Sequence, residues 1–185
     1  MFKSLAITVL ALSAAAAHAQ QAYVGATLAP GADWVYRTAP GNPAASEKVL
    51  FGKLYGGYAF DETWAIEGGF GLYEKARFDK ADTGSAYDAT SKATLVYLAG
   101  RATHRFNDKW SVSGKLGAVR HNQRLDHGDR VHTGHDVRPM FGLGTSYDLT
   151  PGAALILDFN DYGTMRTSEV TRKVRKLEAG VKLSF

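Results

Sequence analysis

The chain has 185 residues, a net charge of +4 and no cysteine. Its length suits one domain, and the lack of cysteine excludes disulfides, thiol catalysis and thiolate metal sites. The basic balance, with a pI near 9.2, favours anionic lipid head groups as partners. The mean hydropathy of −0.21 would indicate a soluble protein, unless polar residues on one face of membrane-spanning strands lower the average.

The N-terminal segment has the pattern of a secretory signal peptide. A positive start at Lys3 precedes an apolar run from Leu5 to Ala17, and the segment 17–19 (AHA) fits the small-x-small cleavage rule. The run is too short for a transmembrane helix, which needs roughly 20 residues. We predict a signal peptide at 1–19 and one mature domain at 20–185, with a retained N-terminal anchor as the alternative. Because the chain is expected to be exported, nucleic acid is not an expected partner.

Eight strands are predicted in the mature chain, because apolar and polar residues alternate in eight segments. These segments are 22–30, 48–60, 63–73, 92–106, 110–120, 137–148, 153–161 and 174–185. Short turns at 60–64 (FDETW), 106–110 (FNDKW) and 148–152 join them in pairs, and the second turn repeats the first. Long polar segments at 31–47, 74–91, 120–137 and 161–173 join the other ends. Short turns that alternate with long loops are typical of an outer-membrane barrel, whose short turns are periplasmic.

The last strand gives the clearest pattern. Every second residue from Leu177 to Phe185 is apolar, and polar or small residues stand between them. A strand that ends on an aromatic residue is the usual closing strand of a bacterial outer-membrane barrel, and we expect it to be read by the barrel assembly machinery. The fold prediction is therefore all-β, an eight-stranded antiparallel up-and-down transmembrane β-barrel. A soluble eight-stranded barrel such as a lipocalin is the alternative, against which the signal peptide and Phe185 weigh.

The alternation also assigns the two faces of the strands. Apolar residues such as Leu54, Leu98 and Leu116 are predicted to face lipid, and the mid-strand charges are predicted to face the lumen. These lumenal residues are Lys53, Glu67, Arg101, Lys115, Asp158, Glu178 and Lys182. A Lys or Arg on the lipid face near mid-bilayer costs about 2–4 kcal/mol, and buried charges need partners. We therefore expect an ion-pair network that fills the interior.

The residues from Gly56 to Asp61 and from Ala65 to Phe70 resemble the second hairpin of the OmpA-like transmembrane β-barrel family. Similar matches lie at 115–117, 139–144, 149–151 and 180–185, so the resemblance covers nearly the whole mature chain. Related small barrels, the opacity and OmpX-like proteins, share the C-terminal signature. Since classical members continue into a periplasmic peptidoglycan-binding domain that has no match here, we expect the barrel without that tethering function.

The resemblance implies a lumenal charge network built on a carboxylate at Glu67 and basic residues at Arg101 and Lys115. Ser146 and Ile156 stand where the family usually has another carboxylate and an arginine. Asp158 and Glu178 are the candidates to compensate for them. The pairing inside the barrel, and any gated pore that depends on it, can therefore differ from those of the family.

Basic residues gather in the last two long polar segments and directly beside them. They are Arg120, Arg124, Arg130, Arg138, Arg166, Arg172 and Lys173. Arginine pairs well with phosphate, so these side chains are candidates for contact with lipopolysaccharide. A solvated rim of mixed charge is the alternative, because acidic residues such as Asp126 and Asp136 are interspersed.

Four of the six histidines lie between 120 and 138: His121, His127, His132 and His135. Imidazole is a common metal ligand, but the spacing matches no defined site, so a solvated loop is the prediction and no metal or cofactor is expected.

Lipid A deacylases place His, Ser and a carboxylate together on the outer surface. His104 lies on the lipid-facing register near a periplasmic turn, and no serine accompanies it at that family's spacing.

The function predicted from the sequence is non-enzymatic. We expect an integral protein of the bacterial outer membrane with a structural role in envelope integrity. Its outer loops would contact lipopolysaccharide or serve in adhesion, and outer-membrane lipids would be its partners. A narrow ion or small-solute channel and a lipid A modifying enzyme are the two alternatives.

Overall fold

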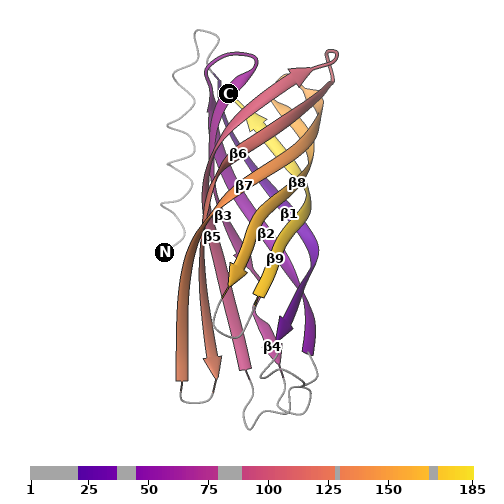
Figure 1. Ribbon diagram of the computed structural model, residues 1–185. Coiled ribbons are helices and arrows are strands. Elements are labelled where there is room, and N and C mark those ends of the chain that lie inside the picture. The colour runs from indigo at the N-terminus through magenta and orange to yellow at the C-terminus, as the bar shows by residue number, and fades with distance from the viewer. Residues whose placement is uncertain (1–20, 37–44, 79–88, 128–129, 167–170) are drawn as a thin grey trace, which may run out of the picture.

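The computed structural model describes residues 21–36, 45–78, 89–127, 130–166 and 171–185. Their strands run obliquely around a common axis (Figure 1). The strands are β1 (Gln21–Tyr36), β2 (Ala45–Ala59), β3 (Trp64–Tyr73), β4 (Ala76–Phe78), β5 (Ala89–Arg105), β6 (Trp110–His127), β7 (Arg130–Thr150), β8 (Ala153–Arg166) and β9 (Thr171–Ser184). β3 and β4 both pair with β5, so they form one interrupted strand of an eight-stranded barrel. Among the described residues, no helix is long and apolar enough to cross a membrane.

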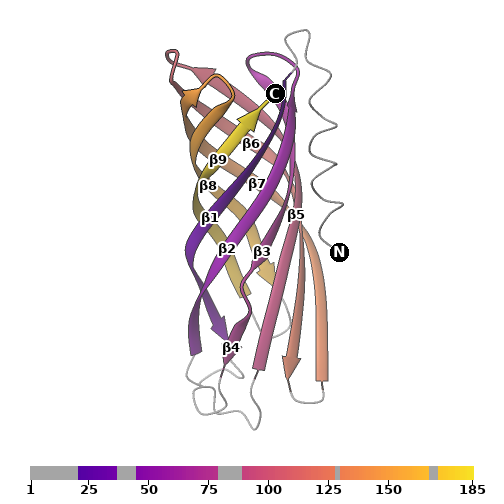
Figure 2. The same cartoon turned by 180° about the vertical axis from the view of Figure 1, so that it is seen from behind.

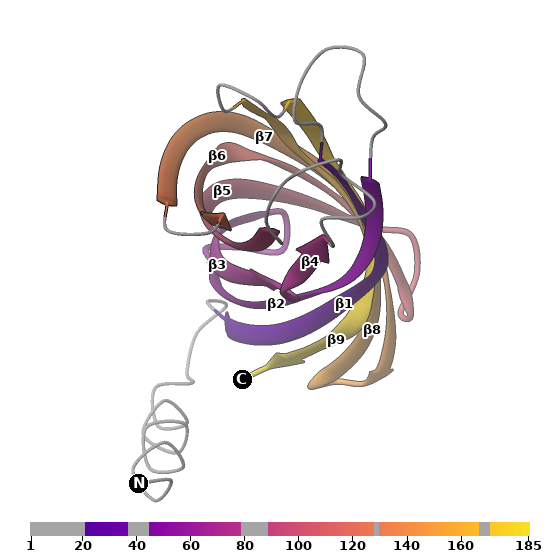
Figure 3. The ribbon, with the colours of Figure 1, turned by 90° about the horizontal axis from the view of Figure 1, so that it is seen from below.

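The sheet closes on itself. Strands that follow one another in the chain pair antiparallel, except β3 and β4, which both pair with β5, and β1 pairs with β9 from Tyr23↔Ser184 to Leu28↔Ala179. Viewed along the axis, the strands form a ring (Figure 3). Closure matters because a backbone N–H or C=O group left unpaired in hydrocarbon costs several kcal/mol. The prediction of an eight-stranded antiparallel up-and-down barrel is confirmed.

The FDETW and FNDKW segments form the same turn. Asp61 Oδ1 accepts hydrogen bonds from the backbone N–H groups of Thr63 and Trp64, each 2.7 Å long. Asn107 Oδ1 accepts the two equivalent bonds in the second copy, each 2.9 Å long. A side chain that accepts from the backbone just ahead of it stabilises a tight turn, which explains the repeat. Both turns lie at the end of the barrel that carries the C-terminus (Figures 1 and 2).

The long polar segments are not the loops that the alternation predicted. β6 and β7 continue as a ladder from Arg120↔Val137 to His127↔Arg130, so the predicted loop at 120–137 is wrong. Strands likewise extend into the segments 31–47, 74–91 and 161–173. Both faces of a strand meet water outside the membrane, so the backbone ladder persists there without any alternation to reveal it. The remainder of these segments, at 37–44, 79–88, 128–129 and 167–170, lies outside the described residues.

Three strands extend farther than the rest of the barrel. β6 pairs with β5 as far as Ala89↔His127 and with β7 as far as His127↔Arg130, but the ladder of β7 with β8 ends at Phe141↔Asp161. The β6–β7 hairpin, with β5 beside it, therefore projects from the end opposite the short turns (Figure 1, lower left). This end is the outer one, because short turns mark the periplasmic side of such barrels.

The outward face agrees with the predicted lipid-facing register. Large apolar side chains such as Leu116 and Leu54 are 74% and 66% exposed. Others include Leu28, Phe70, Leu72, Leu98, Phe141, Leu143, Leu155, Leu177 and Leu183. Aromatic residues flank the short turns, and the Trp110 ring packs against Tyr147 with centroids 4.9 Å apart. Trp and Tyr favour the membrane interface, so these rings mark the periplasmic edge of the belt.

Gly180 tests the closure of the barrel. A Cβ atom there would meet the backbone of Ala26 and Thr27 across the β1–β9 seam, whereas one at Gly100 would find its nearest neighbour, Leu116 O, 3.9 Å away. We expect Gly180→Ala to lower the free energy of unfolding by about 1–3 kcal/mol, because overpacked atoms force strands apart. Urea titration followed by heat-modified gel mobility measures this, with Gly100→Ala as the matched control. Equal stability of the two variants would contradict the close approach.

Candidate functional site

Glu67 is the centre of the charged interior. It lies on β3 with its side chain wholly buried, and it pairs with Arg101 Nη1 at 3.1 Å and with Lys115 Nζ at 2.9 Å. The hydroxyls of Tyr23 and Tyr97 donate to its two oxygens, at 3.1 and 2.7 Å. The strand register explains this arrangement, because Arg101 on β5 stands directly opposite Lys115 on β6. A buried carboxylate with two cations and two hydroxyl donors is fully compensated.

Glu178 forms a second centre on β9. Lys53 Nζ lies 2.6 Å from Glu178 Oε2, and Thr27 donates to the same oxygen at 2.8 Å. Tyr162 and Asn160 donate to Oε1 at 2.7 and 3.1 Å. Lys53 also donates to the Tyr162 hydroxyl at 3.3 Å. Side chains from three other strands, β1, β2 and β8, therefore converge on one buried carboxylate, and each of its oxygens has two donors.

Asp158 completes the charged layer. Lys115 Nζ lies 2.6 Å from Asp158 Oδ2 while it also contacts Glu67, so one ammonium bridges two carboxylates. Lys53 lies 5.5 Å from the Tyr97 ring centroid, and Tyr97 donates to Glu67. The two centres are thus joined by an aromatic ring and by packing, and the described residues contain no ion pair between them.

Lys182 does not join either centre. Its side chain is half-buried near the short turns, and its Nζ lies 5.9 Å from the Tyr23 ring centroid. Within the part of the chain that the structure describes, no carboxylate pairs with it. Ser146 and Ile156 both face the lumen, and the Ser146 hydroxyl lies 2.6 Å from that of Ser111. A pair of small hydroxyls therefore occupies the place where the resemblance leads one to expect further charge.

Several interior residues escaped the sequence prediction. Thr27 and Tyr97 lie between lipid-facing neighbours, so alternation alone could have placed them in the lumen. Tyr162 was assigned to a loop because the predicted strand ended at 161. It lies inside the barrel with no exposed surface and contacts both Lys53 and Glu178. Neutral polar side chains thus supply more than half of the donors to the two glutamates.

A largely apolar layer fills the lumen on the outer side of the two glutamates. Phe51, Leu95, Val119 and Val174 have no exposed surface, and each lies farther from the short turns than the lumenal charges Lys53, Arg101, Lys115 and Glu178 of the same strands. The Phe51 ring packs on Tyr73 with centroids 4.7 Å apart. Two buried polar side chains share this layer: His121, which stands opposite Leu95, and Lys176. An eight-stranded barrel is only wide enough for side chains to fill, and here the outer filling is mostly apolar.

The outward face of β5, β6 and β7 carries a groove of about 280 Å³ beyond the apolar belt. Its lining includes Lys92, Thr94, Asn122, Arg124, Thr133 and His135. Arg124 Nε lies 2.9 Å from Asp126 Oδ1, and more than half of the Arg124 side chain is exposed. We call these lining residues the outer groove. It was not predicted, because the residues come from three strands that the sequence showed as loops or strand ends.

The predicted basic rim divides over two faces. Arg120 and Arg124 are exposed on the outward face of β6. Arg138 lies opposite the buried Val119 and pairs with Asp136 at 2.7 Å, so it faces the interior side of the hairpin. The side chains of Arg130, Arg166, Arg172 and Lys173 lie outside the described ones.

The histidine cluster is also divided. His121 is buried, with Nε2 2.9 Å from the carbonyl oxygen of Tyr162, whereas His135 is exposed on the opposite face. These two cannot bind one metal ion, and the described side chains include no group of three potential ligands. The side chains of His127 and His132 lie outside the described ones.

A family model described as the outer membrane protein β-barrel domain matches residues 4–185. No curated protein matches the sequence. Similar solved structures include Ail, the attachment invasion locus protein of Yersinia pestis, in complex with the heparin analogue sucrose octasulfate. It has a TM-score of 0.62 and 15% identity, over 91% of this chain and 100% of that chain.

Neisserial surface protein A has a TM-score of 0.62 and 15% identity, over 91% of this chain and 98% of that one. The N-terminal β-barrel domain of Pseudomonas aeruginosa OprF has a TM-score of 0.58 and 11% identity, over 89% and 97% of the two chains. At such identities these likenesses show a shared fold.

Removing Glu67 tests the charged interior. We expect Glu67→Ala to lower the free energy of unfolding by about 3–5 kcal/mol, because it leaves Arg101 buried without a carboxylate. Heat-modified gel mobility across a temperature or urea series measures the loss. Asp126→Ala removes the partner of a mostly exposed arginine and should cost less than about 1 kcal/mol. A barrel as indifferent to Glu67→Ala as to Asp126→Ala would contradict the structural role of the network.

Proposed function

Because the chain belongs to the outer membrane protein β-barrel domain family, as a small OmpA-like barrel of the bacterial outer membrane, we propose that it supports the envelope by contacting lipopolysaccharide. In this proposal the barrel is closed and non-enzymatic, and the contact is made by the outward face of β5–β7. The observation that carries the proposal is the outer groove, which sets basic side chains directly beyond the lipid-facing belt.

Cross-strand neighbours show how this face changes with height. Leu98, Ala118 and Pro139 form one outward row, and Val96, Arg120 and Val137 form the next. Farther out come the rows Thr94–Asn122–His135 and Lys92–Arg124–Thr133. The surface thus passes from hydrocarbon to basic and hydrogen-bonding groups within three rows. A lipid lying beside the barrel would place its acyl chains against the first rows and its head group against the last.

Lipopolysaccharide fits this surface by its chemistry. Its head group carries phosphates on sugars, and Arg and Lys bind phosphate by charge-assisted hydrogen bonds. Asn122, Thr94 and Thr133 add donors and acceptors suited to sugar hydroxyls. The Ail structure in complex with sucrose octasulfate gives a precedent for a polyanionic sugar on a barrel of this fold. The projecting β6–β7 hairpin offers further surface for adhesion.

The apolar layer weighs against the channel alternative. Phe51, Leu95, Val119 and Val174 occupy much of the lumen between the central ion pairs and the outside, and the polar side chains beside them, His121 and Lys176, are themselves buried. If the ion pairs of Glu67 and Glu178, on the periplasmic side of this layer, exchanged partners, the layer itself would remain in place.

The placement of His104 weighs against the lipid A enzyme. The His104 ring packs edge-on against Phe106 with centroids 5.1 Å apart, and its strand neighbour is Val112. Ser111 and Ser113 are buried on the lumenal side. A nucleophile and base that converge on one point are needed for acyl transfer, and these side chains diverge.

Replacing the basic side chains of the outer groove tests the proposal. We expect the double variant Lys92→Gln, Arg124→Gln to bind purified lipopolysaccharide about tenfold or more weakly, since each hydrogen bond to a charged group contributes about 1.5–3 kcal/mol. Binding is measured by titration of the refolded barrel in detergent free of phosphate groups. The control is Lys75→Gln, which removes an exposed charge outside the groove. Equal binding by all three proteins would refute the groove as the contact.

Conductance tests the closed state. We expect the protein in planar bilayers to give no discrete conductance steps at neutral pH, because buried side chains, most of them apolar, fill the outer lumen. Stable steps from a single barrel would restore the channel alternative.

A further inference from the structure

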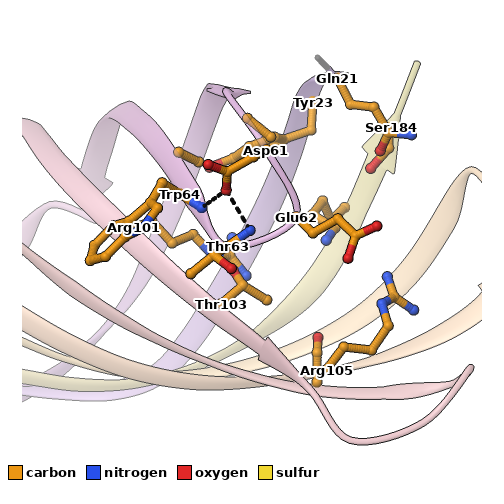
Figure 4. A pocket seen from close by; sticks show the side chains of 14 residues that line it. Gln21, Tyr23, Asp61, Glu62, Thr63, Trp64, Arg101, Thr103, Arg105 and Ser184 are labelled. Carbon is orange, nitrogen blue, oxygen red and sulfur yellow. Dashed lines mark hydrogen bonds between the residues drawn. The ribbon is translucent and has the colours of Figure 1, made fainter. Parts of the chain in front are cut away.

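The periplasmic end of the lumen holds a second cavity, independent of the outer groove. It measures about 360 Å³ and opens beside the FDETW turn (Figure 4). Its walls include Tyr23, Arg101, Thr103, Arg105, Ser111 and Lys182. Ligand pockets for small molecules begin at about 300 Å³. We call this cavity the periplasmic vestibule.

The vestibule contains a lysine without a carboxylate partner and an unused arginine donor. Arg101 is 5% exposed, and its Nε has no acceptor among the described residues, although its Nη1 binds Glu67. Lys182 lines the same space without a carboxylate partner in the described part of the chain. Arg105 also lines the cavity, and Asp148 neutralises it at 2.7 Å. The Lys182 ammonium and the buried Nε–H of Arg101 are therefore both available to an acceptor that enters the cavity.

The carboxylates at the mouth do not supply the missing partners. Asp61 is turned back onto its own turn, where it accepts from Thr63 and Trp64 (Figure 4). Glu62 is exposed and forms no ion pair among the described side chains. Arg101 thus lies at the buried end of the cavity, Lys182 is half-buried in its wall, and the acidic groups Asp61 and Glu62 are exposed at its rim. An anion that entered would meet charge of opposite sign where water is most restricted, which strengthens the attraction.

We propose that the periplasmic vestibule binds a phosphate-type oxyanion, alone or on a small solute, between Arg101 and Lys182. Thr103 and Ser111 line the same cavity; the Thr103 hydroxyl can donate to a further oxygen, whereas the Ser111 hydroxyl already hydrogen-bonds with that of Ser146. The charged and apolar layers close the cavity toward the outside, so the site exchanges with the periplasm. The barrel acts there as a receptor, not as a conduit.

Titration with inorganic phosphate tests this site. The refolded barrel in a detergent without phosphate groups is followed by the NMR signals of Arg101 Nε–H and of the backbone amides of Thr103 and Ser184. We expect saturable shifts confined to the vestibule. Lys182→Gln should weaken binding about tenfold or more, and Lys182→Arg should restore most of it. Lys182→Gln leaves no carboxylate unpaired, so we expect its heat-modified mobility to equal that of the unaltered protein.

The matched control is Lys109→Gln, which removes a charge from a periplasmic turn outside the cavity lining. Equal weakening by Lys109→Gln and Lys182→Gln, or shifts that grow linearly without saturation, would overturn the proposal.

The same phosphate titration in phospholipid nanodiscs shows whether the bound oxyanion belongs to a lipid head group or to a soluble anion. Vestibule signals already shifted there, and insensitive to added phosphate, would assign the oxyanion to a lipid head group. An unchanged phosphate titration would assign it to a soluble anion.

Discussion

The ladder between β1 and β9 is the contact on which the rest of the structure depends. It joins the two ends of the chain through the pairs from Tyr23↔Ser184 to Leu28↔Ala179. Without it, two strand edges would present unpaired backbone groups to hydrocarbon, where no water can satisfy them. Closure also fixes the side-chain parity of both strands. Thr27 and Glu178 meet inside at 2.8 Å because the register allows no other arrangement.

Closure then decides what the interior can hold. A barrel of eight strands is filled by side chains, so each charge forced inward by lipid must find its partner within that narrow space. Glu67 and Glu178 each collect donors from several strands, and Lys115 bridges two carboxylates. Such buried pairs are costly to break, and they lock the relative heights of the strands. The buried charges therefore help to fix the register between strands, and they also fill the barrel.

Much of the membrane part could be predicted, because lipid imposes a period of two on every spanning strand. Glu67, Arg101 and Lys115 follow from that period alone, and so does the outward face from Leu54 to Leu143. The prediction failed where the constraint ends. Beyond residue 120 both faces of the strands meet water, so the sequence no longer alternates between apolar and polar residues. The outer β6–β7 ladder was therefore predicted to be a loop. The outer groove and the vestibule combine side chains from several strands, and their assembly depends on register offsets that no single strand encodes.

Along the barrel axis, the interior consists of an outer, mostly apolar layer and a middle layer of ion pairs. A largely apolar layer around Phe51 and Leu95 fills the outer side, and the ion pairs of Glu67 and Glu178 form the middle. A change in the middle alone, such as an exchange of partners by Lys115, leaves the outer layer in place. Under the proposed functions, binding at either end requires no rearrangement of these two layers, whereas passage through the barrel requires a change in both. Lys182 of the vestibule and the basic residues of the outer groove lie at the two ends, which is why we place recognition at each surface.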